Sequence, residues 1–179
     1  KKGNIMFNFK KYLISLLVLF SASCFSLDRV VVFVCTGNTG RSPMAEALAK
    51  DYVEKHNLNI SVQSRGVNVD PNETNPEEGT VKVLKDRNID ISSHKATQLV
   101  KEDIDSSDYL LTMTQKHKDR ILSKYPEAQG KVYTLAEFAT GKNEDLSDPY
   151  KMPIAAYIKV ENQLDKFLPL ALDKIANEK

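Results

Sequence analysis

The segment Cys-Thr-Gly-Asn-Thr-Gly-Arg-Ser, from Cys35 to Ser42, places a cysteine and an arginine six positions apart, between a hydrophobic run and a helical run. In such a loop the backbone N–H groups and the positive end of the following helix dipole converge on one point and bind a dianion there. The same groups stabilise a thiolate at the centre, where Cys35 is expected. The segment therefore predicts a phosphate-binding loop that carries its own nucleophile.

The other loop residues fit this geometry. Gly37 and Gly40 permit sharp turns, and Asn38 tolerates a left-handed backbone better than most residues. Arg41 offers its planar guanidinium to two phosphate oxygens. Ser42 can hydrogen-bond to the Cys35 sulfur, either before Cys35 is phosphorylated or afterwards, when the sulfur is the leaving group. The alternative, a buried structural cysteine before an ordinary turn, accounts less well for the strand, the glycines and the proline-led helix around it.

A nucleophile that attacks phosphorus also needs an acid to protonate the leaving group. Asp148-Pro149-Tyr150 is the candidate, because proline keeps the preceding residue extended and so favours a loop that projects the aspartate over a pocket. Tyr150 would form an aromatic wall beside the substrate. Asp-Pro alone is a common turn signal, so the assignment depends on the first motif.

With these two motifs the chain resembles the low-molecular-weight protein tyrosine phosphatase family, whose pattern is Cys-x5-Arg-Ser near the start and Asp-Pro-Tyr or Asp-Pro-Phe near the end. The resemblance runs from about Val30 to the last helix. It implies Cys35 as nucleophile, Arg41 as transition-state clamp and Asp148 as general acid, acting on a phosphorylated protein without a cofactor. The substrate-binding residues it implies are Thr36, Gly37, Asn38, Thr39, Gly40, Ser42 and Tyr150, and Ser64 and His94 match positions that brace the loop.

The loop sequence most resembles the bacterial branch of this family that acts on phosphoarginine. Thr39 stands where phosphotyrosine enzymes usually carry an aliphatic residue, and its hydroxyl is expected to accept a hydrogen bond from the guanidinium. Phosphotyrosine remains the alternative substrate, since Tyr150 offers an aromatic wall. An inactive phosphate-binding module would not require the set Cys35, Arg41 and Asp148, and thioredoxin-coupled arsenate reductases need two further cysteines where this chain has only Cys24.

The loop departs from the family at one position. Many relatives carry a second cysteine immediately before the loop arginine, able to form a protective disulfide with the nucleophile, whereas this chain has Gly40 there. The usual route for recovering an oxidised Cys35 is therefore missing.

Alternating strand and helix signals must position these residues. Strands are predicted at 29–34, 60–64, 109–113 and 131–135, and helices at 43–56, 80–87, 115–124 and 154–177. Asn75 is the expected N-cap of the second helix, with Pro76 in its first position, and Pro169 is expected to kink the last one. The pattern predicts an α/β single domain, a doubly wound four-stranded parallel sheet with helices on both faces, and a site at the carboxyl ends of the strands.

The first 26 residues have a different character, and we expect a leader at 1–26 and the phosphatase domain at 27–179. Met6 is a plausible initiator, Lys10 and Lys11 form a basic region, and an apolar stretch at 12–20 precedes small residues at 21–23. This is the pattern of a signal peptide for export, and the apolar stretch is too short for a stable membrane span. The alternatives are lipidation at Cys24 and a cytoplasmic enzyme with a misassigned start.

Charge and histidine content limit the partners. Twenty-five basic and 24 acidic residues leave a net charge of +1, which argues against nucleic acid as a partner, and we expect a monomer. His56 and His117 are predicted in helical surroundings without a partner. Three histidines without clustered cysteines or carboxylates give no metal-binding pattern.

Overall fold

Four parallel strands form the centre of the computed structural model, which describes residues 28–178. They are β1 (Arg29–Cys35), β2 (Ile60–Gly66), β3 (Tyr109–Thr112) and β4 (Val132–Thr134), in the order β2-β1-β3-β4. The register places Phe33 of β1 beside Ser64 of β2 and Leu111 of β3. The predicted fold class is confirmed.

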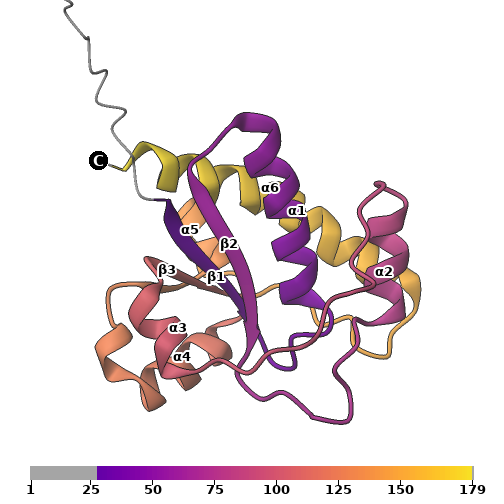
Figure 1. Cartoon of the computed structure of the whole chain (residues 1–179), viewed down its shortest axis with the longest axis horizontal. Coiled ribbons are helices and arrows are strands. Elements are labelled where there is room, and N and C mark those ends of the chain that lie inside the picture. The colour runs from indigo at the N-terminus through magenta and orange to yellow at the C-terminus, as the bar shows by residue number, and fades with distance from the viewer. Residues whose placement is uncertain (1–27, 179) are drawn as a thin grey trace, which may run out of the picture.

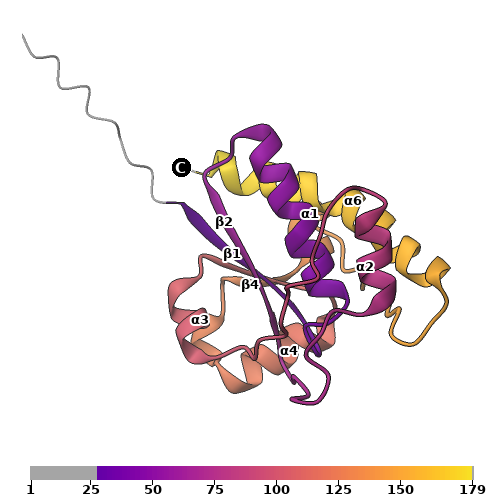
Figure 2. The same cartoon turned by 45° about the vertical axis from the view of Figure 1, so that its right-hand side comes forward.

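Helices cover both faces of this sheet (Figures 1 and 2). One face packs against α1 (Arg41–His56), α2 (Glu78–Lys85), α5 (Leu135–Thr140) and α6 (Ile154–Asn177). The other packs against α3 (Lys101–Ser106), α4 (Gln115–Lys124) and the 3-10 turn η1 (Pro126–Ala128). Because β1 is covered on both sides, its sequence is a continuous apolar run rather than an alternating one.

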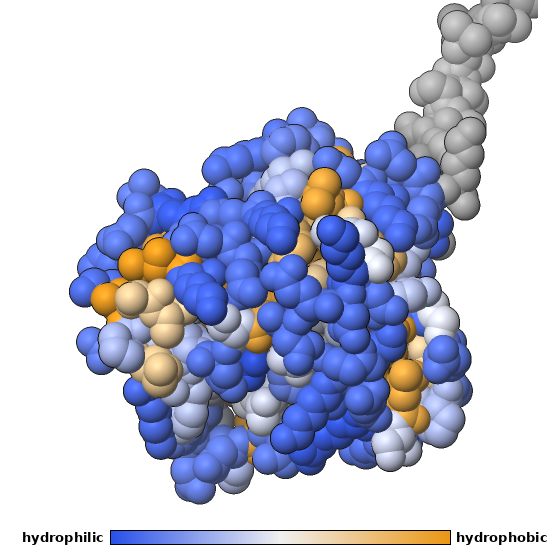
Figure 3. Space-filling model, turned by 180° about the vertical axis from the view of Figure 1, so that it is seen from behind, coloured by the Kyte–Doolittle hydropathy of each residue, from blue (hydrophilic) through white to orange (hydrophobic). Residues whose placement is uncertain are grey.

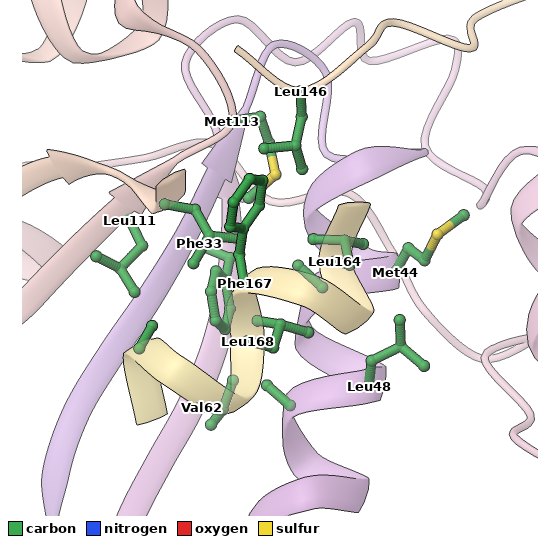
Figure 4. Packing of buried hydrophobic residues seen from close by; sticks show 14 of the residues in the cluster. Phe33, Met44, Leu48, Val62, Leu111, Met113, Leu146, Leu164, Phe167 and Leu168 are labelled. Carbon is green, nitrogen blue, oxygen red and sulfur yellow. The ribbon is translucent and has the colours of Figure 1, made fainter. Parts of the chain in front are cut away.

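The larger core lies between the sheet and the pair α1 and α6. Phe33 of β1 points toward Phe167 and Leu164 of α6, and Met44 lies on α1 beside them (Figure 4). Phe33 and Phe167 are completely buried. Removing each such side chain from water contributes about 1.5–3 kcal/mol, so this contact fixes α6 against the sheet.

The order of the strands explains where the site lies. The chain leaves β1 for β2 on one side and returns to β3 on the other, so β1 and β3 flank the point where the winding reverses. Ligands bind outside the carboxyl ends of the strands at this point. Cys35 is the last residue of β1 and therefore opens into that crevice.

The helices differ from the prediction at several ends. α1 begins at Arg41 rather than Pro43, and the N-cap of α2 is Glu77 rather than Asn75. Leu135 begins α5 instead of ending a strand, because the Thr134 hydroxyl accepts the Glu137 N–H and caps a helix there. Neither α3 nor α5 was predicted, since each is only six residues long.

Two further expectations concern the ends of the chain. α6 continues through Pro169 to Asn177, so the proline does not end the helix. The predicted leader at 1–26 and Cys24 lie outside the described residues. Within residues 28–178, none of the helices combines the length and the apolar character needed to cross a bilayer.

Candidate active site

A pocket of about 250 Å³ opens at the carboxyl end of β1. It contains the predicted nucleophile, clamp and acid together with residues from the stretch between β2 and α2. The residues that line it are Cys35, Thr36, Gly37, Thr39, Gly40, Arg41, Asn68, Asp70, Glu73, Glu77, Asp148, Pro149 and Tyr150. Two motifs more than a hundred positions apart in the sequence therefore meet at one place.

Cys35 lies at the base of this pocket as a free, buried cysteine. Its Sγ accepts the Asn38 backbone N–H at 3.2 Å and lies 3.0 Å from the Ser42 hydroxyl. Asn38 adopts a positive φ of 59°, which turns the backbone around the sulfur. Because α1 starts at Arg41, Ser42 belongs to the first helical turn, and the positive end of the dipole faces the Cys35 sulfur.

Asn38 holds the loop through its side chain. Its amide group donates to the Ser42 hydroxyl at 2.9 Å and to the Ser64 hydroxyl at 2.8 Å, and its side-chain oxygen accepts the Thr97 N–H at 2.8 Å. The Asn38 backbone carbonyl lies 2.8 Å from His94 Nε2. Ser64 and His94 thus contact the loop through Asn38 and not through the phosphate-binding centre.

Glu46 extends this hydrogen-bond chain, and it was not identified from the sequence. The Ser64 hydroxyl donates to Glu46 Oε2 at 2.5 Å, and Lys50 pairs with the other carboxylate oxygen. The carboxylate directs the single hydrogen of Ser64, which leaves the serine oxygen free to accept from Asn38. Glu46 lies in α1, four residues after Ser42, on the same side of the helix.

Arg41 and Asp148 form an ion pair across the pocket, with Arg41 Nη2 2.9 Å from Asp148 Oδ2. The arginine side chain is 7% exposed and the aspartate side chain 59% exposed, so the cation is fixed and the carboxylate borders solvent. Backbone contacts hold the segment before Asp148, because the Leu146 N–H donates to the Met113 carbonyl at the end of β3. The arrangement allows a phosphoryl group to compete with Asp148 for the guanidinium of Arg41.

Tyr150 stands at the rim, where it is 42% exposed. Its hydroxyl donates to Glu73 Oε2 at 2.7 Å, and its backbone N–H contacts Asp148 Oδ1 at 3.3 Å. The ring therefore forms one side of the entrance, as a wall beside the substrate requires.

Thr39 differs from its expected arrangement. Its hydroxyl donates to Glu77 Oε1 at 3.0 Å, so the hydrogen is committed to a carboxylate that the sequence analysis did not include. The Tyr157 hydroxyl donates to the other oxygen, Glu77 Oε2, at 2.7 Å. The polar character at this position of the pocket thus comes from Thr39 and Glu77 together.

His117 was expected to have no partner, and the structure corrects this. Its Nε2 lies 2.9 Å from the Thr36 hydroxyl of the loop, and its Nδ1 lies 3.0 Å from the Thr114 hydroxyl that caps α4. Burial, followed by the positive charge of Arg41, lowers the pKa of His117 to about 4. The imidazole is therefore neutral near pH 7 and supports the loop as a donor and an acceptor.

A sequence signal for His117 did exist. Thr114, the N-cap of α4, lies three positions before His117 and shortly after β3. It therefore places this histidine at the same edge of the sheet as the loop. The expectation that His56 has no partner is also corrected: it is exposed on α1, where its Nδ1 meets the Tyr52 carbonyl and its ring stacks on the Tyr52 ring. Within the described part of the chain, no group of three or more His, Cys, Asp or Glu residues could hold a metal ion.

The charges that line the pocket are mostly negative. Asp70, Glu73, Glu77 and Asp148 contribute carboxylates, and Arg41 contributes the cation that faces them. A nucleophile, a forked cation and a carboxylic acid around one pocket suit attack on phosphorus. The additional carboxylates suit a ligand that carries positive charge beside its phosphoryl group.

Known proteins resemble this chain over nearly all of the described residues. Residues 30–179 match the model of the family described as "Low molecular weight phosphotyrosine protein phosphatase". A protein-arginine-phosphatase from Bacillus subtilis is 40% identical over 139 residues, which is 77% of this chain and 91% of the relative. A low molecular weight protein-tyrosine-phosphatase from Staphylococcus aureus is 38% identical over 121 residues, 67% of this chain and 77% of the relative.

The solved structures include a close match with a modified active site. It is an arginine phosphatase in which the active-site residue, mutated to serine, is phosphorylated. It superposes with a TM-score of 0.80 at 35% identity and covers 84% of this chain and 97% of the solved chain.

Proposed function

This chain belongs to the low-molecular-weight protein tyrosine phosphatase family, and on that basis we propose that it removes the phosphoryl group from phosphoarginine in proteins, through a phosphocysteine intermediate on Cys35. The places of Arg41 and Asp148 in the pocket support the proposed roles of clamp and general acid. Phosphotyrosine is the second candidate substrate.

In the first step the Cys35 thiolate attacks phosphorus, and the bond between phosphorus and the guanidino nitrogen breaks. The electron pair of that bond goes to the nitrogen, and protonated Asp148 gives it a proton. Arg41 and the loop N–H groups bind the phosphoryl oxygens in the transition state. Asp148 lies beside Arg41 at 2.9 Å, so the acid and the clamp can contact one phosphoryl group together.

In the second step a water molecule attacks the phosphocysteine, and the Asp148 carboxylate takes its proton. The bond between sulfur and phosphorus breaks, the electron pair returns to sulfur, and inorganic phosphate leaves. The Ser42 hydroxyl, 3.0 Å from the sulfur, hydrogen-bonds to the departing thiolate. The hydrogen bond from the Asn38 amide, at 2.9 Å, keeps this hydroxyl in place.

The observation that favours phosphoarginine is the charge of the pocket. The lining of the pocket includes four carboxylates and one arginine. Asp148 pairs with this arginine, Arg41, and the other three carboxylates, on Asp70, Glu73 and Glu77, do not. A phosphotyrosine ring gains nothing from these carboxylates, which repel its phosphate. A phosphoguanidinium presents N–H donors to them. The Tyr150 ring and the staphylococcal relative keep phosphotyrosine as the alternative.

The test compares kcat/KM on two peptides that differ only in phosphoarginine or phosphotyrosine. We expect the phosphoarginine peptide to be preferred and acid quenching to trap phosphate on Cys35. Cys35→Ser is the control and should lose at least about 10³-fold of turnover. A preference for phosphotyrosine would replace the first substrate with the second, and near-normal turnover by Cys35→Ser would refute the mechanism.

Thr39 provides a second test of the substrate. Thr39→Ile removes the hydroxyl that contacts Glu77, and it should shift the ratio of the two kcat/KM values toward phosphotyrosine by at least about tenfold, or 1.4 kcal/mol. An unchanged ratio would exclude Thr39 from substrate selection.

A further inference from the structure

We propose that Glu77 is a specificity-determining residue whose carboxylate binds the guanidinium of phosphoarginine beside the phosphate loop. The inference rests on the proposed function, because only a substrate with a cationic group next to its phosphorus can use this carboxylate. Glu77 lies outside both sequence motifs and enters the pocket from the N-cap of α2.

The Glu77 carboxylate has a fixed position beside the loop. Its Oε1 accepts from the Thr39 hydroxyl at 3.0 Å, its Oε2 accepts from the Tyr157 hydroxyl at 2.7 Å, and the Glu77 N–H donates to the Thr39 carbonyl at 2.9 Å. Each carboxylate oxygen can accept about two hydrogen bonds, and one hydroxyl occupies one of these sites on each. Both oxygens therefore keep a site for the N–H groups of a guanidinium, which binds carboxylates in pairs of parallel hydrogen bonds.

Two glycines make room for this arrangement. A Cβ at Gly40 would lie 2.5 Å from Glu77 Oε1 and 2.8 Å from its carboxyl carbon, so the bare backbone of Gly40 lets the carboxylate reach the loop. A Cβ at Gly79 would lie 2.5 Å from atoms of the Tyr157 ring. The ring thus packs closely against the first turn of α2, and its hydroxyl reaches Glu77.

No cationic side chain of the described residues pairs with the Glu77 carboxylate. Its partners are hydroxyl groups, and Glu77 takes part in none of the ion pairs formed among residues 28–178. Burial and the hydrogen bond to Glu77 raise the pKa of Tyr157, so its hydroxyl keeps its proton and continues to donate. A half-buried carboxylate beside a dianion site weakens the binding of a simple phosphate, whereas a substrate that brings its own cation turns the repulsion into attraction.

The test is Glu77→Gln, which keeps the size of the side chain and removes its charge. We expect kcat/KM for a phosphoarginine peptide to fall at least tenfold, chiefly through KM, while kcat/KM for a phosphotyrosine peptide and for para-nitrophenyl phosphate stays within twofold or rises. The matched control is Glu78→Gln, the neighbouring exposed carboxylate that lies outside the pocket, and it should leave both substrates unchanged. Tyr157→Phe removes one of the two hydroxyls that hold Glu77 and should give a smaller loss in the same direction.

The outcomes separate this inference from the function on which it rests. If the wild-type protein cleaves the phosphotyrosine peptide and leaves phosphoarginine intact, the proposed substrate is wrong. If the wild-type protein prefers phosphoarginine, and Glu77→Gln lowers kcat/KM equally for the two substrates or for neither, Glu77 is not a specificity determinant. The proposed function then still stands. A loss of kcat/KM confined to the phosphoarginine peptide in Glu77→Gln, together with unchanged kcat/KM values in Glu78→Gln, supports the inference.

Discussion

A chain of side-chain hydrogen bonds runs from Glu46 through Ser64, Asn38 and Ser42 to the sulfur of Cys35. Glu46 takes the hydrogen of Ser64, and the Asn38 amide donates to both serine oxygens, so the hydrogen of Ser42 is left for the Cys35 sulfur at 3.0 Å or the Arg65 carbonyl at 3.3 Å. A buried polar group that loses its partner costs about 1–3 kcal/mol, and the chain therefore stabilises one geometry of the loop over others.

At the residue scale, the clearest prediction concerns the acid. Asp148→Ala should lower kcat by about 10²–10⁴, because the leaving nitrogen or oxygen departs without a proton. The loss should become smaller for aryl phosphates with better leaving groups, which can be measured with a series of substituted phenyl phosphates. A loss of equal size across that series would assign Asp148 a structural role through its pairing with Arg41.

His117 gives a prediction about pH and stability. Its pKa in the folded protein is about 4, against about 6.5 in an unfolded chain. As the pH falls from about 6.5 to about 4, the unfolded state binds a proton that the folded state does not, so the free energy of unfolding decreases by up to about 3 kcal/mol. The stability that neutral His117 contributes is therefore complete above pH 6.5 and lost on acidification.

The measurement is urea denaturation of the wild type and His117→Gln at pH 7 and pH 4.5. Glutamine offers one donor and one acceptor but does not titrate, so the stability advantage of the wild type should shrink at the lower pH. Carboxylates that also titrate in this range affect both proteins and cancel in the difference. An advantage that is the same at both pH values would contradict a buried neutral histidine.

At the scale of elements, α2 follows its N-cap Glu77 and packs against α6 where Gly79 contacts the Tyr157 ring. Gly79→Ala should destabilise the protein by about 1 kcal/mol, because the displaced ring costs about 1–3 kcal/mol and the better helix propensity of alanine returns up to about 1. In a Tyr157→Ala background the ring is absent, and the same substitution should stabilise. Denaturant unfolding of the four proteins in this cycle measures the sign change, and the same sign in both backgrounds would refute the packing argument.

The sequence predicts the long elements and the loop, and it fails for short helices and distant partners. β1, α4 and α6 follow from a continuous apolar run and from helical spacing, and the loop motif predicts the place of Cys35 and Arg41. α3 and α5 are too short to show a periodicity, so they depend on caps and tertiary packing. Glu46, Glu77 and His117 were missed because their contacts with the loop depend on how separate elements meet, not on local spacing.

At the scale of the whole molecule, the net charge of +1 hides a local excess of carboxylates at the pocket. Seen from behind, the surface is mostly hydrophilic, with apolar side chains in separate groups (Figure 3). Substrate choice therefore depends on the local field of one pocket and not on the overall balance of charge.

The fold should not depend on the predicted leader. β1 begins at Arg29, and the residues between 28 and 178 already form two extensive core clusters. A chain that starts at Leu27 should unfold within about 2 °C of the full chain, less than the shift that 1 kcal/mol produces, and keep its kcat/KM. A larger drop in Tm would show that residues 1–26 contribute to the domain.

Export remains a prediction from the sequence. We propose that the leader is removed after Ser23 or Ser26 during export, and mass spectrometry of the N-terminus from the native cell tests it. A mature chain that begins at Leu27, or at a Cys24 without a modification, supports the proposal. A lipid on Cys24 would make the protein a lipoprotein, and an intact leader would favour the cytoplasm.

The bare backbone at Gly40 links the redox chemistry of the loop to the position of Glu77. The space beside it holds the Glu77 carboxylate, and a side chain at position 40 would meet that carboxylate at 2.5 Å. Because the carboxylate is the end of a flexible side chain, a cysteine at position 40 would turn it away from the Thr39 hydroxyl rather than unfold the loop. Gly40→Cys should therefore place a second thiol beside Cys35 and, in the same step, withdraw Glu77 from the position in which we propose that it binds the substrate.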